Sequence, residues 1–138
     1  MTRARLAPVA YEDLNSRQRE IRNFHKIAAR LADFGFHSMW LSDDWQGADF
    51  LAVHIDGETI MRVQQKSRAT IDRKYLGRGL HIAYLADGAV FLYLHDDLVS
   101  HWQQNVPSWG QSASWASGAV HWGAPPAWLK LWLDEHRL

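Results

Sequence analysis

The chain has 138 residues, enough for one domain with a single hydrophobic core, so we treat residues 1–138 as one domain. It contains 15 basic and 15 acidic residues and no cysteine, which excludes disulfides, thiolate nucleophiles and a strong overall field for nucleic acid. The basic N-terminus lacks the apolar segment of a signal peptide, and no apolar run could span a bilayer, so we expect a cytoplasmic protein with no membrane partner.

The first predicted element is a helix over residues 15–34. Asn15 or Ser16 can cap its start, and Gly35 can end it in a left-handed conformation. Glu20 borders the apolar stripe, which places it near the domain interior, or alternatively it is a solvated acid favoured by the helix dipole. The stripe recurs at three and four residue steps and consists of Ile21, Phe24, Ile27, Ala28, Leu31 and Phe34.

Two hairpins are expected after this helix. FHSMWL at 36–41 can form a strand, followed by the polar turn SDDWQG. The pair Asp56-Gly57 then separates two apolar runs, which is a strong hairpin signal, and Asp87-Gly88 joins HIAYLA to AVFLYL in the same way. Two hairpins predict an antiparallel sheet of about four strands.

The remaining chain is rich in tryptophan. We expect a short helix over DDLVSHWQQ, a loop over residues 105–118, a short strand GAVHW, and a last helix over AWLKLWLDEHRL. Trp128 and Trp132 have core-like spacing on that helix. Trp109 and Trp115 lie in the predicted loop, where they are candidates to stack on bases or to bury a partner surface, including that of a homodimer.

The first hairpin predicts a site at its open end. If Asp56 and Gly57 are the central residues of a two-residue turn, Asp49 lies opposite Gln64, with facing Cβ atoms about 4.5 to 5.5 Å apart. Lys66 points to the same face. A bulge would place Gln65 opposite Asp49 instead.

These side chains suit the hydrolysis of phosphodiester bonds. Mg²⁺ or Mn²⁺ could be held by Asp49, by the side-chain carbonyl of Gln64 and by the backbone carbonyl of Gln65. Lys66 could position a water or stabilise charge on the phosphate. The alternative is a polar strand end with a surface pair of Asp and Lys.

The sequence G-A-D, a hairpin and then Gln-x-Lys resembles the motif of the PD-(D/E)XK nuclease superfamily, which includes restriction endonucleases and Holliday junction resolvases. The stretches NSRQREIRNFHKIAARLADFGF, DDWQGADFLAVHIDGET and KSRATIDRKYLG also resemble a group of uncharacterised bacterial PD-(D/E)XK-like proteins. The resemblance covers about residues 15–105. Residues 106–138 then form a Trp-rich C-terminal extension outside it. It implies a restriction endonuclease-like α/β (α+β) fold, with an α-β-β-β-α-β core and a mixed sheet flanked by helices.

By position in the motif, Asp49 takes the place of the metal-binding aspartate and Gln64 that of the second acid. Lys66 takes the place of the lysine, and Glu20 that of the acid on the first helix. Two departures are Gly47-Ala48 in place of proline and the neutral Gln64 in place of an acid, which weakens the attraction for Mg²⁺. The expected function is a metal-dependent endonuclease acting on DNA, and the alternative is an inactive nuclease-fold module that binds nucleic acid or protein.

A local run of positive charge follows the motif. Within it, Arg68, Arg73, Lys74 and Tyr75 are expected to contact nucleic acid, unless they form only an exposed loop. Asp43 and Asp44 could add metal ligands, but we favour a turn role for them. Residues 62–78 contain one acid, Asp72, and six basic residues: Arg62, Lys66, Arg68, Arg73, Lys74 and Arg78.

Overall fold

The computed structural model describes residues 6–138. The main sheet is built from β1 (Phe36–Trp45), β2 (Ala48–His54), β3 (Ile60–Lys66), β5 (Leu80–Ala86) and β6 (Ala89–Leu94). A small second sheet consists of β4 (Ala69–Asp72) and β7 (Ala119–Trp122). The α-helices are α1 (Ser16–Ala32), α2 (His95–Asn105), α3 (Ala113–Ser117) and α4 (Ala127–Glu135). Short 3-10 helices are η1 (Tyr11–Asp13), η2 (Arg73–Tyr75) and η3 (Trp109–Gln111).

The main sheet has the order β1-β2-β3-β5-β6. Both predicted hairpins are present, because β2 pairs with β3 and β5 pairs with β6 in antiparallel fashion. The two hairpins are joined by a parallel pairing of β3 with β5, so the antiparallel sheet of about four strands was wrong. The mixed sheet flanked by helices, expected from the family resemblance, is confirmed.

The order of elements differs from the expected α-β-β-β-α-β core at one place. A parallel pair needs a crossover connection, which is commonly an α-helix. Here the crossover from β3 to β5 consists of β4 and η2, and the next α-helix, α2, follows β6. This arrangement matters for the site because the crossover carries most of the basic residues of the positively charged run at residues 62–78.

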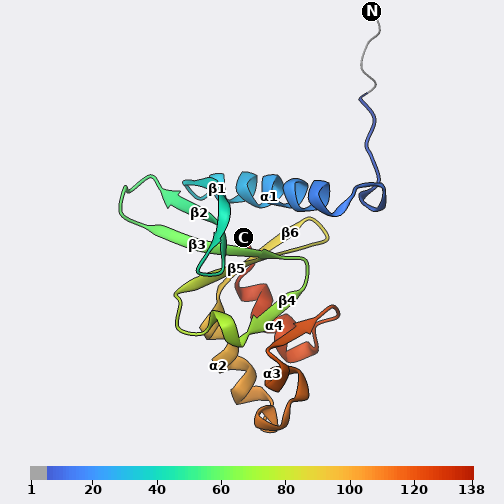
Figure 1. Cartoon of the computed structure of the whole chain (residues 1–138), viewed down its shortest axis with the longest axis vertical. Coiled ribbons are helices and arrows are strands. Elements are labelled where there is room, and N and C mark those ends of the chain that lie inside the picture. The colour runs from blue at the N-terminus through green and yellow to red at the C-terminus, as the bar shows by residue number, and fades with distance from the viewer. Residues whose placement is uncertain (1–5) are drawn as a thin grey trace, which may run out of the picture.

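Helices lie on both sides of the main sheet (Figure 1), and each face of the sheet has its own hydrophobic core. Ile27 and Leu31 of α1 pack on one face against Phe50, Met61 and Val63. The other face carries Ile82 and Tyr93, which pack with residues of α2, α4 and the small sheet. Alternation along β3 therefore points Met61, Val63 and Gln65 toward α1, and points Arg62, Gln64 and Lys66 away from it.

The predicted first helix is confirmed as α1. Asn15 and Gln18 form a reciprocal capping box, in which each side chain accepts a hydrogen bond from the backbone N–H of the other residue. Gly35 has a φ of 84° and follows the last turn. This fixed start holds Glu20, at the end of the first full turn, above the end of β3.

The first strand is longer than predicted. β1 continues to Trp45, and its register with β2 shifts between Trp40 and Trp45. The chain reverses at Gln46 and Gly47, with φ of 55° and 92°. Asp43 and Asp44 therefore belong to an irregular strand end and not to a turn spanning SDDWQG.

The C-terminal segment is also more ordered than predicted. Residues 105–118, expected as a loop, contain η3 and α3, while α4 ends at Glu135, earlier than the pattern suggested. The short strand is confirmed as β7, paired with β4. No helix in the described part of the chain is long and apolar enough to cross a membrane.

Candidate functional site

The register of the β2–β3 hairpin is as predicted, although its turn is wider. Leu51 lies opposite Arg62 and Val53 opposite Ile60. The last backbone bond runs from His54 N–H to the Thr59 carbonyl at 2.9 Å, and the Asp56 carboxylate accepts hydrogen bonds from backbone N–H groups inside the turn. The side chain of Asp56 thus stabilises a turn that keeps the register of a two-residue hairpin.

Asp49 lies at the open end of this hairpin, one residue beyond the pair of Phe50 with Val63 that ends the ladder. Its Oδ2 accepts a hydrogen bond from the backbone N–H of Gln65 at 3.0 Å. Burial raises the pKa of the Asp49 carboxyl to about 6, helped by the charges of Glu20 and Asp44 and opposed by the Gln65 N–H and by Lys66. The carboxyl is therefore held where a nearby cation would strongly favour its ionised form.

The residues predicted as catalytic converge on one hollow of about 230 Å³. Glu20 reaches it from α1, and it also forms an exposed ion pair with Arg17 at 2.8 Å. The hollow lies where the end of the β2–β3 hairpin faces α1. Its lining residues are Tyr11, Glu20, Asn23, Ile27, Asp49, Gln64, Gln65, Lys66 and Ser67.

Gln65 contributes more than the backbone carbonyl that the sequence suggested. Its Nε2 donates a hydrogen bond to the backbone carbonyl of Glu20 at 2.9 Å, which fixes the orientation of the amide because a carbonyl can only accept. Its Oε1 is buried and has no hydrogen-bond partner among the residues described. A buried oxygen without a donor is costly, so this side chain marks a position where a polar ligand would be stabilised. The alternation of side chains along β3, which turns residue 65 toward α1, was the sequence feature that could have indicated this role.

Lys66 also lines the hollow. Burial lowers the pKa of its ammonium group, and the charge of Lys74 lowers it further. The Nζ atoms of Lys66 and Lys74 lie 5.7 and 5.2 Å from the centroid of the Tyr75 ring. Both lysines thus make a cation–π contact with the same tyrosine ring.

Tyr75 differs from the exposed contact residue expected from the sequence, since only 3% of it is accessible to solvent. Its ring packs against Gly47 so closely that a Cβ on the glycine would lie 2.9 Å from a ring carbon. Tyr75 therefore links the turn before Asp49 with the side chain of Lys66. Arg68, Arg73 and Lys74 are exposed, as expected for surface contacts.

Asp43 and Asp44 line a second, smaller hollow that also contains Glu20 and Asp49. The Oδ1 of Asp44 accepts a hydrogen bond from the backbone N–H of Gly47 at 2.8 Å. Asp44 thus bonds to the backbone of the turn, as we favoured, although the residue itself lies at the end of β1.

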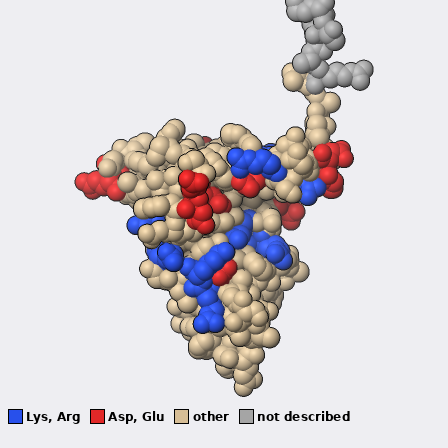
Figure 2. Space-filling model, viewed as in Figure 1, with Lys and Arg blue, Asp and Glu red and all other residues tan. Residues whose placement is uncertain are grey.

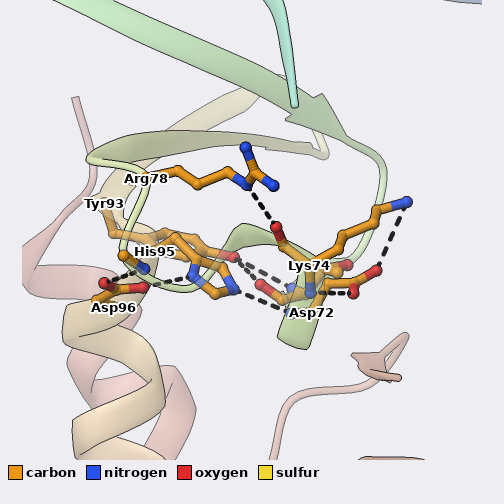
Figure 3. Close-up of polar contacts among 8 residues, drawn as sticks. Asp72, Lys74, Arg78, Tyr93, His95 and Asp96 are labelled. Atoms are coloured by element: carbon orange, nitrogen blue, oxygen red, sulfur yellow. Dashed lines mark hydrogen bonds and ion pairs between the residues drawn. The ribbon is translucent and has the colours of Figure 1, made fainter. Parts of the chain in front are cut away.

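Sequence reasoning missed a buried histidine behind the basic segment (Figure 3). His95 is fully buried, its Nε2 accepts from the backbone N–H of Asp72 at 2.9 Å, and its Nδ1 lies 2.8 Å from the Asp96 carboxylate. Burial lowers the pKa of His95, although Asp96 opposes this effect. The neutral ring with its proton on Nδ1 satisfies both contacts. A histidine followed by an acid at the start of a helix was the only local signal.

Comparison with protein-family models and with curated protein sequences finds no match. Among solved structures, the chain is similar to a bacterial homing endonuclease, I-Ssp6803I, with a TM-score of 0.51 and 11% sequence identity. The similarity covers 88% of this chain and 94% of that one. The chain therefore shares the fold of an endonuclease over most of its length.

Proposed function

We propose that the protein is a metal-dependent nuclease that hydrolyses phosphodiester bonds in DNA. One observation carries the proposal: a half-buried carboxylate, two amides, a lysine and a helix acid, drawn from α1 and from neighbouring strands, line a single hollow. The fold shared with a homing endonuclease supports it. The order of Asp49, Gln64 and Lys66 on a hairpin further supports assignment to the PD-(D/E)XK superfamily.

The donor atoms of the hollow suit Mg²⁺ or Mn²⁺. Asp49, Glu20, the Gln64 side chain and the Gln65 carbonyls offer only oxygen, which hard cations prefer. In the described part of the chain, no three acids, histidines or cysteines are grouped closely enough to hold a metal by themselves. A cation here would thus depend on amide or main-chain oxygens in addition to Asp49 and Glu20.

Each residue has a distinct role in this proposal. A bound cation supplies polarisation of a phosphoryl oxygen and activation of a water. Asp49 and Glu20 contribute the negative charge of the site. Lys66, with its lowered pKa, orients the attacking water or stabilises charge that develops on the phosphate.

The test is cleavage of linear, nicked and branched DNA in the presence of Mg²⁺ or Mn²⁺ by the wild type and by Lys66→Ala. We expect the variant to lose about 10² to 10⁴-fold in rate, the usual contribution of a positioned proton-transfer or charge-stabilising group. Lys130→Ala is the matched control, because Lys130 is exposed on α4. Equal rates for the wild type and Lys66→Ala would contradict the catalytic role.

The alternative is an inactive nuclease-fold module that binds nucleic acid or protein. The neutral Gln64 and the lack of a cluster of three acids in the described residues favour it. Calorimetry of Mg²⁺ binding decides between the two functions. Uptake that is abolished by Asp49→Ala supports the nuclease, whereas DNA binding without any metal uptake supports the module.

A further inference from the structure

We propose that Arg62, Arg73, Lys74 and Arg78 form a preorganised platform for the sugar-phosphate backbone of a DNA duplex, here called the phosphate platform. It rests on the proposed function only for the nature of the ligand. Three of these residues lie on the crossover between β3 and β5, and Arg62 lies on β3 itself. Figure 2 shows Lys and Arg side chains gathered in a band across the middle of the visible face, beside a group of acidic side chains.

Backbone carbonyls hold all three arginines in place. Arg62 Nη1 donates to the carbonyl of Arg78 at 3.1 Å, and its guanidinium lies 5.0 Å from the centroid of the Trp45 ring. Arg78 Nε donates to the carbonyl of Lys74 at 2.8 Å, and Arg73 Nη1 to that of Ala116 at 3.4 Å. A guanidinium has five N–H donors, so each arginine keeps donors for a ligand after making its structural bond.

The arginines of the platform have no carboxylate partner among the described residues, since none lies at ion-pair distance from Arg62, Arg73 or Arg78. By contrast, Arg17 pairs with an acid on α1, and Arg30 pairs with the acid that caps the C-terminal end of that helix. Only Lys74 has a partner, Asp72, at 3.7 Å. Positive groups gathered without counter-charges repel one another, and an anionic ligand would relieve that repulsion.

Two residues at the start of α2 hold the segment from Asp72 to Gly77 (Figure 3). At the start of this segment, His95 accepts a hydrogen bond from the backbone N–H of Asp72. Near its end, Asp96 Oδ2 accepts from the backbone N–H of Gly77 at 2.9 Å. Arg78 then stands between Gly77 and Gly79, whose φ values of 70° and 63° favour glycine. Because both ends are held, little conformational entropy is lost when a ligand binds.

The platform borders the hollow, since Lys74 and Lys66 lie against the same Tyr75 ring. Arginine and lysine contacts with phosphates fix the position of a duplex and carry no sequence information directly. The platform would therefore place a phosphodiester next to Lys66 and Asp49, and leave sequence discrimination to other parts of the molecule.

The experiment measures binding of a DNA duplex of mixed sequence, without divalent metal, by fluorescence anisotropy over a range of salt concentrations. Arg62→Gln and Arg78→Gln remove one charge each and keep a side-chain donor for the carbonyl that the arginine contacts. Each is expected to weaken binding several-fold and to lower the slope of log affinity against log salt by about 0.9, the value for one lost phosphate contact. The double variant is expected to lose roughly twice that slope.

Arg30→Gln is the matched control, because it removes the same charge from a residue paired with Asp33. Its slope should equal that of the wild type. Equal slopes for Arg30→Gln and both platform variants would overturn the platform, even if the protein cleaves DNA. Conversely, lowered slopes in a protein that does not cleave DNA would support the platform and count against the proposed hydrolysis.

Discussion

At the scale of single residues, opposing effects act on the ionisation of the Asp49 carboxyl. This carboxyl is partly buried, yet it accepts a backbone hydrogen bond that favours ionisation. Burial outweighs that bond, and the pKa rises from 3.8 to about 6. A raised folded pKa means that the neutral acid is the form that folding favours, so the contribution of this group to stability is complete below about pH 4 and is lost as the pH rises through about 6.

We therefore predict that Asp49→Asn stabilises the metal-free protein at pH 7 but not at pH 4. The asparagine keeps an oxygen for the Gln65 N–H and removes the buried charge. The gain should be roughly 1 to 2 kcal/mol, less than the full linkage value because the carboxyl is partly open to solvent. Urea denaturation at both pH values measures it, and a variant less stable than the wild type at pH 7 would contradict the assigned cause.

Because Gln64 is neutral, the proposed metal site has only the carboxylates of Asp49 and Glu20. We predict that Gln64→Glu increases the affinity for Mg²⁺ by about tenfold, or ~1.4 kcal/mol, because a second strand carboxylate would face Asp49. Calorimetry measures the change, and Gln104→Glu on the exposed end of α2 adds the same charge as a control. A similar gain in both variants would mean that only the overall charge matters.

The turn between β1 and β2 acts at the scale of elements. Gly47 brings the backbone against Tyr75, which in turn supports Lys66 and Lys74. The position of the lysine therefore depends on a turn that lies far from it in the sequence.

We predict that Gly47→Ala destabilises the protein by more than Gly57→Ala. Both glycines have positive φ, of 92° and 74°, so both substitutions cost about 1 to 2 kcal/mol in backbone strain. Only at Gly47 would the new Cβ also meet the Tyr75 ring, whereas nothing lies within 4 Å at Gly57. Thermal unfolding compares the two variants, and equal losses would show that the Tyr75 contact is unimportant.

Local signals predicted the elements that local physics determines. The cap at Asn15, the left-handed Gly35 and the two Asp-Gly turns were readable because each acts within a few residues, and the hairpin register brought Asp49 and Gln64 to one hollow. The parallel pairing of β3 with β5 and the pairing of β4 with β7 could not be predicted from the sequence. In each case the two strands are distant in the chain, and neither sequence specifies its partner. The burial of Tyr75 depends on those pairings, so its role was missed as well.

At the scale of the whole molecule, the tryptophans join the second layer to the main sheet. Trp109 and Trp115, expected as contact residues, pack on Trp102 of α2 with ring centroids 6.2 and 5.4 Å apart. Trp132 packs edge-on against Tyr93 of β6. The tryptophan-rich segment therefore serves internal packing, while a homodimer stays a prediction that light scattering in solution can test.

We predict that Trp115→Ala lowers the free energy of unfolding by about 1 to 3 kcal/mol, because it removes a partly buried ring from the cluster around Trp102. Leu131→Ala, at a side chain that is 70% exposed, should change it little. DNA affinity of the folded variant should equal that of the wild type. Weaker DNA binding at unchanged stability would restore the stacking role.

The pairing of β4 with β7 also has a consequence for the order in which the protein can be assembled. β4 is synthesised before β5, β6 and α2, but its partner strand β7 follows all three. A nascent chain that has completed β3 already holds every residue proposed to bind metal, while the segment that bears Arg73, Lys74 and Arg78 must wait for α2 and β7 before both of its ends are held. The surface proposed to bind DNA would thus take its final shape only after the segments that carry the proposed metal ligands have been synthesised.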